Sequence, residues 1–358
     1  FYKMKHIKHW LATMAVLLCC IAASAHDFMV GNVYYKITSP SKFTVAVTYR
    51  GSSYHQYAGE YSGAVTIPST VTYSGKTYTV TSIEPNTFMG CKLTSINLSN
   101  TITTIGSRAF QDCNGLTSLT LPEGVAIIEG YAFAGCTGLT SLTLSEGMKT
   151  IGDGVFNNCE NLTSIICKAL TPPSAGNEFF YYLDRTIPVY VPASAAPAYL
   201  LDKNWKTFTN IQPIEGGTYV ASGICGDNVA WTLTDEGLLR IEGTGDMTSS
   251  PWYTNKSSIR TVIIGEGVTS IRDYAFSNCT YLTSITIPES LERIEDEGDS
   301  DDDKAFYNCT KLESVHISNL AAWCNISFEG KYSNPLRYAK YLYLNGEAVT
   351  DLVIPNTV

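Results

Sequence analysis

The sequence predicts a β-rich solenoid with short helical turns, built by stacking copies of one repeated unit. Two observations carry this prediction. A Phe-x-x-Cys motif recurs six times, and its first four cysteines are 22, 23 and 23 residues apart. Each motif is followed by an alternating run such as LTSLTL, a turn and a V-x-x-I segment. One such unit cannot bury its apolar side alone, whereas stacked copies place like residues above like.

The unit reads C-x2-L-x2-L-x-L-x3-(V/M/L)-x2-I-x4-F-x2-C and spans 23 residues. Its alternating run predicts a strand with Leu pointing inward and Thr or Ser pointing outward. The recurring Phe predicts an aromatic ladder, and the six recurring cysteines are interpreted as small buried apolar fillers. A disulfide framework, which suits an exported protein, is the alternative. The sequence does not assign Cys167, Cys225 and Cys324 to either state.

Interruptions of the repeat predict five parts. TYSGKTYTV (72–80) predicts a hairpin that turns at Ser74-Gly75, NVAWTLTDEGLLRIEG (228–243) predicts a second one, and Asn345-Gly346 predicts a third. LVIPNTV (352–358) matches the front half of another rung, so we expect the natural protein to continue. The predicted parts are a signal peptide (1–25), a β-rich N-terminal cap with the first rung (26–92), a first repeat block with a closing helix (93–215), a linker and β-hairpin cap (216–258), and a truncated second repeat block (259–358).

These residues resemble the BspA-like leucine-rich-repeat family, the surface and secreted repeat proteins of Bacteroides-type bacteria. The resemblance rests on LTSLTLPEGVAIIEGYAFAGC, VYVPASAAPAYLLDKNWKTFTNI and IRTVIIGEGVTSIRDYAFSNC, and it covers nearly all of the chain after residue 25. It implies an α/β leucine-rich-repeat solenoid, right-handed and curved, that is used for adhesion or protein binding. Host matrix proteins such as fibronectin and fibrinogen are the partners it implies. No single binding residue is carried over, because the shared residues are structural.

The charge and the N-terminus narrow the function classes. The net charge is −9 and the pI is about 5.1, with no Lys/Arg cluster after the leader, which argues against nucleic-acid binding. MKHIKHWLATMAVLLCCIAASA has the layout of a secretory signal with a cut after Ala25, so we expect a secreted or cell-surface protein. A membrane anchor is the alternative, but the apolar run is shorter than the ~20 residues of a span. No later segment predicts a membrane span.

Catalytic and cofactor motifs are not found, so the sequence predicts no enzyme and no cofactor. Only His26, His55 and His316 follow the predicted cut, and they lie far apart in the sequence. No G-x-S-x-G elbow and no zinc-ligand C-x2–4-C pair occurs. SGKT (74–77) resembles the end of a phosphate loop, but Thr70 stands where the first Gly is required.

The outward strand positions are the candidate binding face, because solenoids use such extended faces for binding. The candidate ligand contacts on this face are Thr120, Thr143, Thr286 and His316. Thr117, Thr140 and Thr283 are also expected to point outward, and all these threonines equally suit β-propensity and solubility. A tyrosine cluster gives a second set of candidates, since Tyr packs through its ring and bonds through its hydroxyl. This cluster comprises Tyr54, Tyr57 and Tyr61, with Tyr332, Tyr338, Tyr341 and Tyr343 as a later group.

The acidic run DEGDSDDD (296–303) is interpreted as a loop inserted before Phe306, because insertions into repeats go to such turns. The spacing of Asp299, Asp301 and Asp303 resembles the start of an EF-hand loop, so calcium binding is a second hypothesis. Lys304, however, stands where the glycine is expected.

The sequence therefore predicts a non-catalytic, exported protein that binds a host-matrix or neighbouring-cell surface protein. A carbohydrate-binding surface protein and a structural spacer that displays a missing C-terminal domain are the alternatives.

Overall fold

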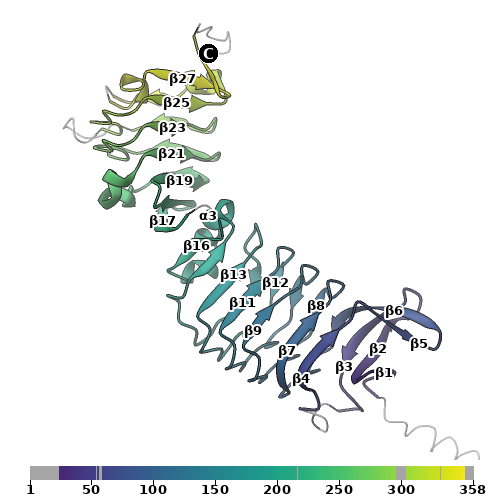
Figure 1. Cartoon of the computed structure of the whole chain (residues 1–358). Helices are drawn as coiled ribbons and strands as arrows, with labels where there is room; N and C mark the ends of the chain where they lie inside the picture. The colour runs from purple at the N-terminus through teal and green to yellow at the C-terminus, as the bar shows by residue number, and fades with distance from the viewer. Residues whose placement is uncertain are drawn as a thin grey trace, which may run out of the picture. The chain divides into compact units, whose positions relative to one another are not determined.

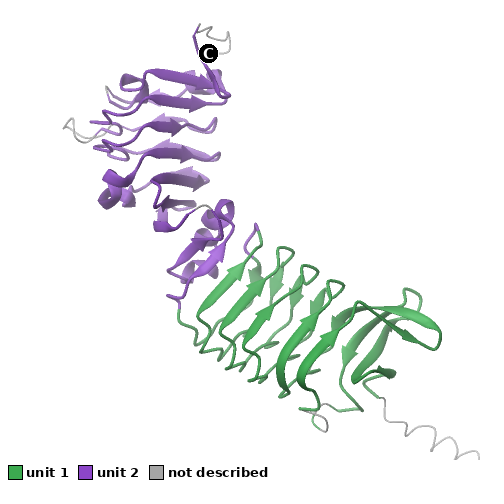
Figure 2. Ribbon diagram, in the orientation of Figure 1, with its two compact units in different colours: residues 1–169, 173–184 green, residues 170–172, 185–358 purple. Residues whose placement is uncertain are grey.

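The computed structural model describes residues 24–53, 55, 59–215, 217–295, 304–330 and 332–350. The chain divides into two compact units (Figure 2). Unit 1 contains the chain up to Ala169 and the segment Pro173–Asp184. Unit 2 contains Leu170–Pro172 and the chain from Arg185 onward. Both units are rich in strands and contain few helices, as a leucine-rich-repeat fold requires. The five parts predicted from the sequence stay a prediction.

Unit 1 is a stack of rungs, each with one longer and one shorter strand (Figure 1). Its strands are β1 (Phe28–Val30), β2 (Val33–Ser39), β3 (Thr44–Thr48), β4 (Ser62–Ile67), β5 (Thr70–Tyr73), β6 (Lys76–Ile83), β7 (Lys92–Leu98), β8 (Thr104–Ile105), β9 (Ser118–Thr120), β10 (Ile127–Ile128), β11 (Ser141–Leu144), β12 (Thr150–Ile151), β13 (Ser164–Cys167) and β14 (Ser174–Ala175). The longer strands β4 and β7 pair in parallel, as do β9, β11 and β13. The shorter strands β8, β10, β12 and β14 follow β6 in a second, parallel arrangement.

Equivalent residues of successive rungs lie side by side, as the repeat predicts. Ser118 pairs with Ser141, which pairs with Ser164, and Leu119 aligns with Leu142 and Ile165 in the same way. These three apolar residues are at most 2% exposed, while the serines between them point outward. The inward Leu and outward Ser or Thr of the repeat are therefore confirmed.

The predicted aromatic ladder is also confirmed. The rings of Phe88, Phe110, Phe133, Phe156 and Phe180 stack in sequence, with centroids 4.9, 5.0, 5.7 and 5.1 Å apart and interplanar angles of 18° or less. All five rings are fully buried. Centroid separations near the ~4.8 Å between hydrogen-bonded strands allow the rings and the strands to stack together.

The ladder cysteines are buried and free, and they do more than fill space. The Cys113 Sγ donates a hydrogen bond to the carbonyl of Phe88 at 2.9 Å, and the Cys136 Sγ donates to that of Phe110 at 3.2 Å. Each thiol thus satisfies a backbone carbonyl of the preceding rung. Cys167 and Cys225 are likewise buried, and Cys324 is half-buried.

In most rungs two residues adopt left-handed backbone conformations, one on either side of the Phe. Arg108 and Asp112 flank Phe110 at φ 56° and 59°, and Tyr274 and Asn278 flank Phe276 at φ 59° and 61°. Asn and Asp tolerate this region better than other non-glycine residues, which accounts for their recurrence before the cysteine. Gly106 has a different role, since a Cβ there would lie 2.6 Å from the nitrogen of Pro85 in the preceding rung.

The shorter-strand sheet of unit 1 extends beyond the first rung through β3, β2 and β1, in the order β1-β2-β3-β6. The predicted hairpin at Ser74-Gly75 is confirmed, because β5 pairs antiparallel with β6 and both turn residues have positive φ, 50° and 77°. The longer-strand arrangement has no such extension among the described residues, and it begins at β4.

Unit 2 repeats the two-strand rung after an opening segment with short helices (Figure 1). Its elements are β15 (Val189–Val191), the 3-10 helix η1 (Ala193–Ala195), α3 (Ala196–Leu201), η2 (Trp205–Thr207), β16 (Ile211–Pro213), β17 (Tyr219–Gly226), β18 (Val229–Thr234), β19 (Leu238–Gly243), β20 (Gly245–Asp246), η3 (Pro251–Ser258), β21 (Thr261–Ile264), β22 (Val268–Ile271), β23 (Ser284–Thr286), β24 (Arg293–Ile294), β25 (Ser314–Ile317), α4 (Leu320–Cys324), β26 (Ser327–Phe328), η5 (Pro335–Arg337), β27 (Tyr341–Leu344) and β28 (Glu347–Ala348). The longer strands run β17-β18-β19-β21-β23-β25-β27-β28, and the shorter ones run β20-β22-β24-β26.

The predicted hairpins of unit 2 are confirmed. β18 pairs antiparallel with β19, and β27 pairs antiparallel with β28 through Asn345 and Gly346, both at positive φ. Two hydrogen bonds join β16 to the start of β17. The Tyr219 amide donates to Gln212 Oε1 at 3.2 Å, and Gln212 Nε2 donates to the Tyr219 carbonyl at 3.4 Å. The aromatic ladder recurs as Trp252, Phe276 and Phe306, with centroids 6.0 and 5.3 Å apart.

The central ring of the unit 1 ladder gives a stability prediction. Phe133→Ala should lower the free energy of unfolding by about 3–5 kcal/mol, because it removes a fully buried ring and leaves a cavity between two stacked neighbours. Urea denaturation measures this loss. Thr120→Ala, an exposed position in the same unit, is the control and should change stability by less than about 0.5 kcal/mol. A loss below about 1 kcal/mol for Phe133→Ala would show that the ladder does not hold the rungs together.

Candidate functional site

The outer face of unit 1 is defined here as the outward side chains of β9, β11 and β13. The predicted site residues Thr120 and Thr143 are in register on adjacent strands, and Ile166 follows them on β13. A second row, Ser118, Ser141 and Ser164, runs beside the first. This face is uncharged along both rows.

The outer face of unit 2 is defined by the outward side chains of β19, β21, β23, β25 and β27. The predicted site residues Thr286 and His316 are paired on β23 and β25, and His316 is paired in turn with Tyr343 on β27. A second row lies two residues earlier on each of these strands and consists of Ser284, Ser314 and Tyr341. In the other direction the first row continues through Ile263 to Arg240.

The aromatic end of the unit 2 face is ordered by stacking. The His316 and Tyr343 rings lie 4.7 Å apart with an interplanar angle of 9°, and His316 Nε2 is 3.1 Å from Ser314 Oγ. Tyr341 lies beside them at 54% exposure. His316 is therefore half-buried by its neighbour on the next strand. The sequence does not connect His316 with the late tyrosines, because the repeat pattern lapses after residue 319.

Two of the threonines expected to point outward, Thr140 and Thr283, also bond to the backbone of the preceding rung. Thr140 Oγ1 donates to the Thr117 carbonyl at 2.9 Å, and Thr283 Oγ1 donates to the Arg260 carbonyl at 2.9 Å. Thr163 repeats this bond, to the Thr140 carbonyl at 3.0 Å. The Thr of each Leu-Thr-Ser run thus links its rung to the preceding one. The Ser and Thr that follow it in the run form the outer face.

Tyr61 does not present its ring to solvent, contrary to the expectation for the tyrosine cluster. Its side chain is 5% exposed, and its ring lies 4.7 Å from that of Phe88, at the start of the aromatic ladder. Its hydroxyl donates to the Thr48 carbonyl at 2.8 Å and accepts from the Tyr34 amide at 3.2 Å. Burial raises the pKa of this phenol well above its ordinary value. Tyr54 and Tyr57 lie outside the described residues.

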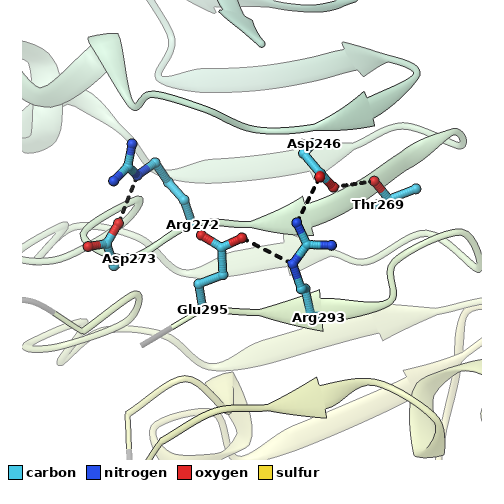
Figure 3. A network of polar contacts seen from close by, with 6 residues as sticks. All are labelled: Asp246, Thr269, Arg272, Asp273, Arg293 and Glu295. Carbon is cyan, nitrogen blue, oxygen red and sulfur yellow. Dashed lines mark hydrogen bonds and ion pairs between the residues drawn. The ribbon is translucent and has the colours of Figure 1, made fainter. Parts of the chain in front are cut away.

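The predicted calcium ligands Asp299, Asp301 and Asp303 also lie outside the described residues. The strand before that loop carries a network on the shorter-strand side of unit 2 (Figure 3). Arg293 Nη2 is 2.7 Å from Asp246 Oδ2, and Arg293 Nε is 3.1 Å from Glu295 Oε1. Thr269 Oγ1 donates to Asp246 Oδ1 at 2.6 Å. The network links three successive rungs, β20, β22 and β24.

Groups for catalysis or metal binding do not gather in the part of the chain that the structure describes. No set of three or more His, Cys, Asp and Glu side chains there is arranged to hold a metal ion. Burial raises the pKa of the Cys113, Cys159 and Cys279 thiols to about 12, so these thiols stay protonated and unreactive. Within the same residues, no helix has the length and apolar character needed to span a membrane.

The fold and the repeat agree with the comparisons to known proteins. The family described as BspA type leucine-rich-repeat region matches in six copies over residues 81–194 and 248–333, more than half of the chain. The chain belongs to this family. No curated protein matches it.

Several solved structures are similar to the chain. A leucine-rich-repeat protein from Bacteroides capillosus ATCC 29799 is 26% identical over 39% of this chain and 97% of that one, with a TM-score of 0.34. A leucine-rich cell surface protein from Faecalibacterium prausnitzii A2-165 is 18% identical over 87% and 96%, with a TM-score of 0.31. The pneumococcal vaccine antigen PcpA is 19% identical over 94% and 93%, with a TM-score of 0.36.

The Arg293 network predicts a pH-dependent contribution to stability. The hydrogen bond from Arg293 holds the pKa of Asp246 below its ordinary value, so its contribution is present above the unfolded-state pKa of ~3.9 and is lost as the pH falls through the lower folded pKa. Because the two side chains are 34% and 45% exposed, Arg293→Met should lower the free energy of unfolding by only about 0–1 kcal/mol at pH 7. The difference from the parent should shrink below about pH 4.

Asp246→Asn and the double variant complete a mutant cycle that isolates the pair from the rest of the acidic surface. Urea denaturation at pH 7 and pH 3 gives the coupling energy. A coupling that is as large at pH 3 as at pH 7 would contradict the assignment to an ionised Asp246.

Proposed function

We propose that this chain is a non-catalytic, exported leucine-rich-repeat protein that binds another protein at the bacterial cell surface through its outer faces. Thr120 and Thr143 in unit 1, and Thr286 and His316 in unit 2, are contact residues in this proposal. The partner class is a host extracellular-matrix protein or a surface protein of a neighbouring cell. Membership of the BspA-type family supports protein binding, and the signal-like N-terminus supports export.

The observation that carries the proposal is the row Thr286, His316, Tyr343 on the outer face of unit 2. Three consecutive parallel strands present these side chains in register, and the stacked imidazole and phenol rings fix one another. Rigid aromatic surface beside hydroxyl groups is typical of protein-binding patches, since ordering it on binding costs little conformational entropy.

Carbohydrate binding is the second candidate, and the same aromatic end favours it. Tyr341 is 54% exposed beside the His316–Tyr343 stack, so an apolar ring surface is open to solvent. Tyr61, one of the three candidate tyrosines of the first cluster, is buried and does not offer its ring to a sugar. A spacer that displays a further domain is the remaining alternative.

The proposal also covers the handedness of the solenoid, its repeat length and its caps. We infer right-handed coiling with repeats of about 23 residues, closed by hairpin caps. The 23-residue offset between Ser118, Ser141 and Ser164 supports that repeat length, and the hairpins β5–β6 and β18–β19 support the caps. We also propose that the parts of the chain meet at residues 25, 92, 215 and 258.

The test is a binding measurement on residues 26–358 with immobilised fibronectin and fibrinogen and with a glycan array, in Ca²⁺ and in EDTA. We expect saturable binding to a matrix protein that survives EDTA. The double variant His316→Ala/Tyr343→Ala should weaken it by about ten-fold or more, because it removes the stacked pair at the centre of the row.

Tyr253→Ala is the matched control, since Tyr253 is 65% exposed but lies on η3, away from the outer face. It should leave the affinity unchanged. Glycan binding alone would favour the carbohydrate candidate. The proposed face would be contradicted if the protein bound neither the matrix proteins nor the glycans. It would also be contradicted if the double variant and Tyr253→Ala lost the same amount of affinity.

A further inference from the structure

A pocket of about 410 Å³ lies at the first rung of unit 1, away from the outer-face rows described above. One wall is the β1–β2 hairpin, with Met29, Val33 and Tyr34, and the other runs from Glu60 along β4 to Thr66. No residue of β7 lines it, so it lies on the side of β4 that does not pair with β7. Pockets of ~300–1,000 Å³ are in the range that holds specific ligands.

The pocket exists because the two sheets of unit 1 end at different points. The shorter-strand sheet continues through β3, β2 and β1, whereas the longer strands begin at β4 (Figure 1). The hairpin therefore stands beside a strand whose second edge has no partner strand among the described residues. None of the backbone hydrogen bonds described outside regular strands reaches residues 62–67 either.

The core is incompletely closed at this edge. Val65 pairs with Ile96, and both side chains are half-buried, although the equivalent Leu119, Leu142 and Ile165 of later rungs are at most 2% exposed. β4 reads SGAVTI, which has neither a charge nor a proline. Exposed edge strands are usually protected by charged residues, prolines or bulges that block pairing, and β4 has only a register shift between Gly63 and Ala64.

We propose that the β4 edge is a second binding site, which accepts an extended peptide segment of a partner protein as an added strand. The peptide's backbone pairs with the unpaired edge, and its apolar side chains enter the space between Val65 and Met29. This mode of recognition draws affinity from main-chain hydrogen bonds and specificity from pockets for alternate side chains.

The negative charge of Glu60 favours peptides that carry a positive charge. Glu60 lines the pocket just before β4, accepts a hydrogen bond from the Tyr34 hydroxyl at 3.2 Å, and is 3.9 Å from Arg50. A contact that long leaves the carboxylate able to bind a second cation. The preferred segment therefore alternates apolar and small polar residues and carries Lys or Arg at the end that meets Glu60.

The test uses the purified protein and fluorescent eight-residue peptides that alternate Val and Thr, with Lys or Ala at either end. Fluorescence anisotropy gives the affinity, and amide hydrogen exchange locates the peptide. We expect saturable binding with new protection at residues 62–67, and a preference for Lys at one end that Glu60→Gln removes. Which end is preferred reports whether the added strand is parallel or antiparallel to β4.

Backbone N-methylation distinguishes strand pairing from simple apolar contact. In a strand, alternate amides point to opposite edges, so methylating one alternate set should weaken binding by about ten-fold or more, while methylating the other set should change it little. Equal affinities for the two methylated peptides, no protection at 62–67, or no binding by any peptide of the set would overturn the proposal.

A pair of neighbouring positions gives the matched protein control. Met29 and Val30 are adjacent on β1 and 53% and 38% exposed, but only Met29 lines the pocket. Met29→Glu should weaken peptide binding by about ten-fold, because it places a charge against the peptide's apolar side chains, and Val30→Glu should not. Equal effects of the two changes would also overturn the site.

Discussion

The stacking of one buried aromatic side chain per rung is the constraint on which both units depend. Ring separations of 4.9–5.7 Å in unit 1 match the spacing of paired strands, so the rings and the two sheets share one period. Each buried Phe contributes about 1.5–3 kcal/mol. The left-handed residues on either side of the Phe, and the thiol that bonds the previous rung's carbonyl, hold the ring in that position.

Because the ladder fixes the register, the outward positions vary without disturbing the core. Unit 1 presents hydroxyl and aliphatic side chains there, whereas unit 2 presents Arg240 at one end and the His316–Tyr343 stack at the other. The same rung geometry therefore supports two chemically different faces. The edge at β4 is a third environment, which arises where the stack begins rather than along its length.

Features that depend on period and turn chemistry could be predicted from the sequence. The Phe ladder, the register of Thr120 with Thr143, and the hairpins at Ser74-Gly75 and Asn345-Gly346 all follow from local signals. The contact of His316 with Tyr343 could not be predicted, because β27 follows an irregular stretch that hides its register. Tyr61 was missed for a related reason. Its ring packs against Phe88 at the start of the ladder, where no Phe-x-x-Cys motif marks the position, and an isolated Tyr gives no sign of burial.

Amide hydrogen exchange of the ladder tests the central claim most directly. The amides of Phe110, Phe133 and Phe156 donate to carbonyls of the following rung at 2.7, 3.0 and 2.9 Å. If stacked rings lock the rungs together, these three amides exchange only when unit 1 unfolds, with protection that is similar among them and equal to its global stability. Exchange at the rate of exposed loop amides, or protection that falls sharply from one rung to the next, would contradict the account.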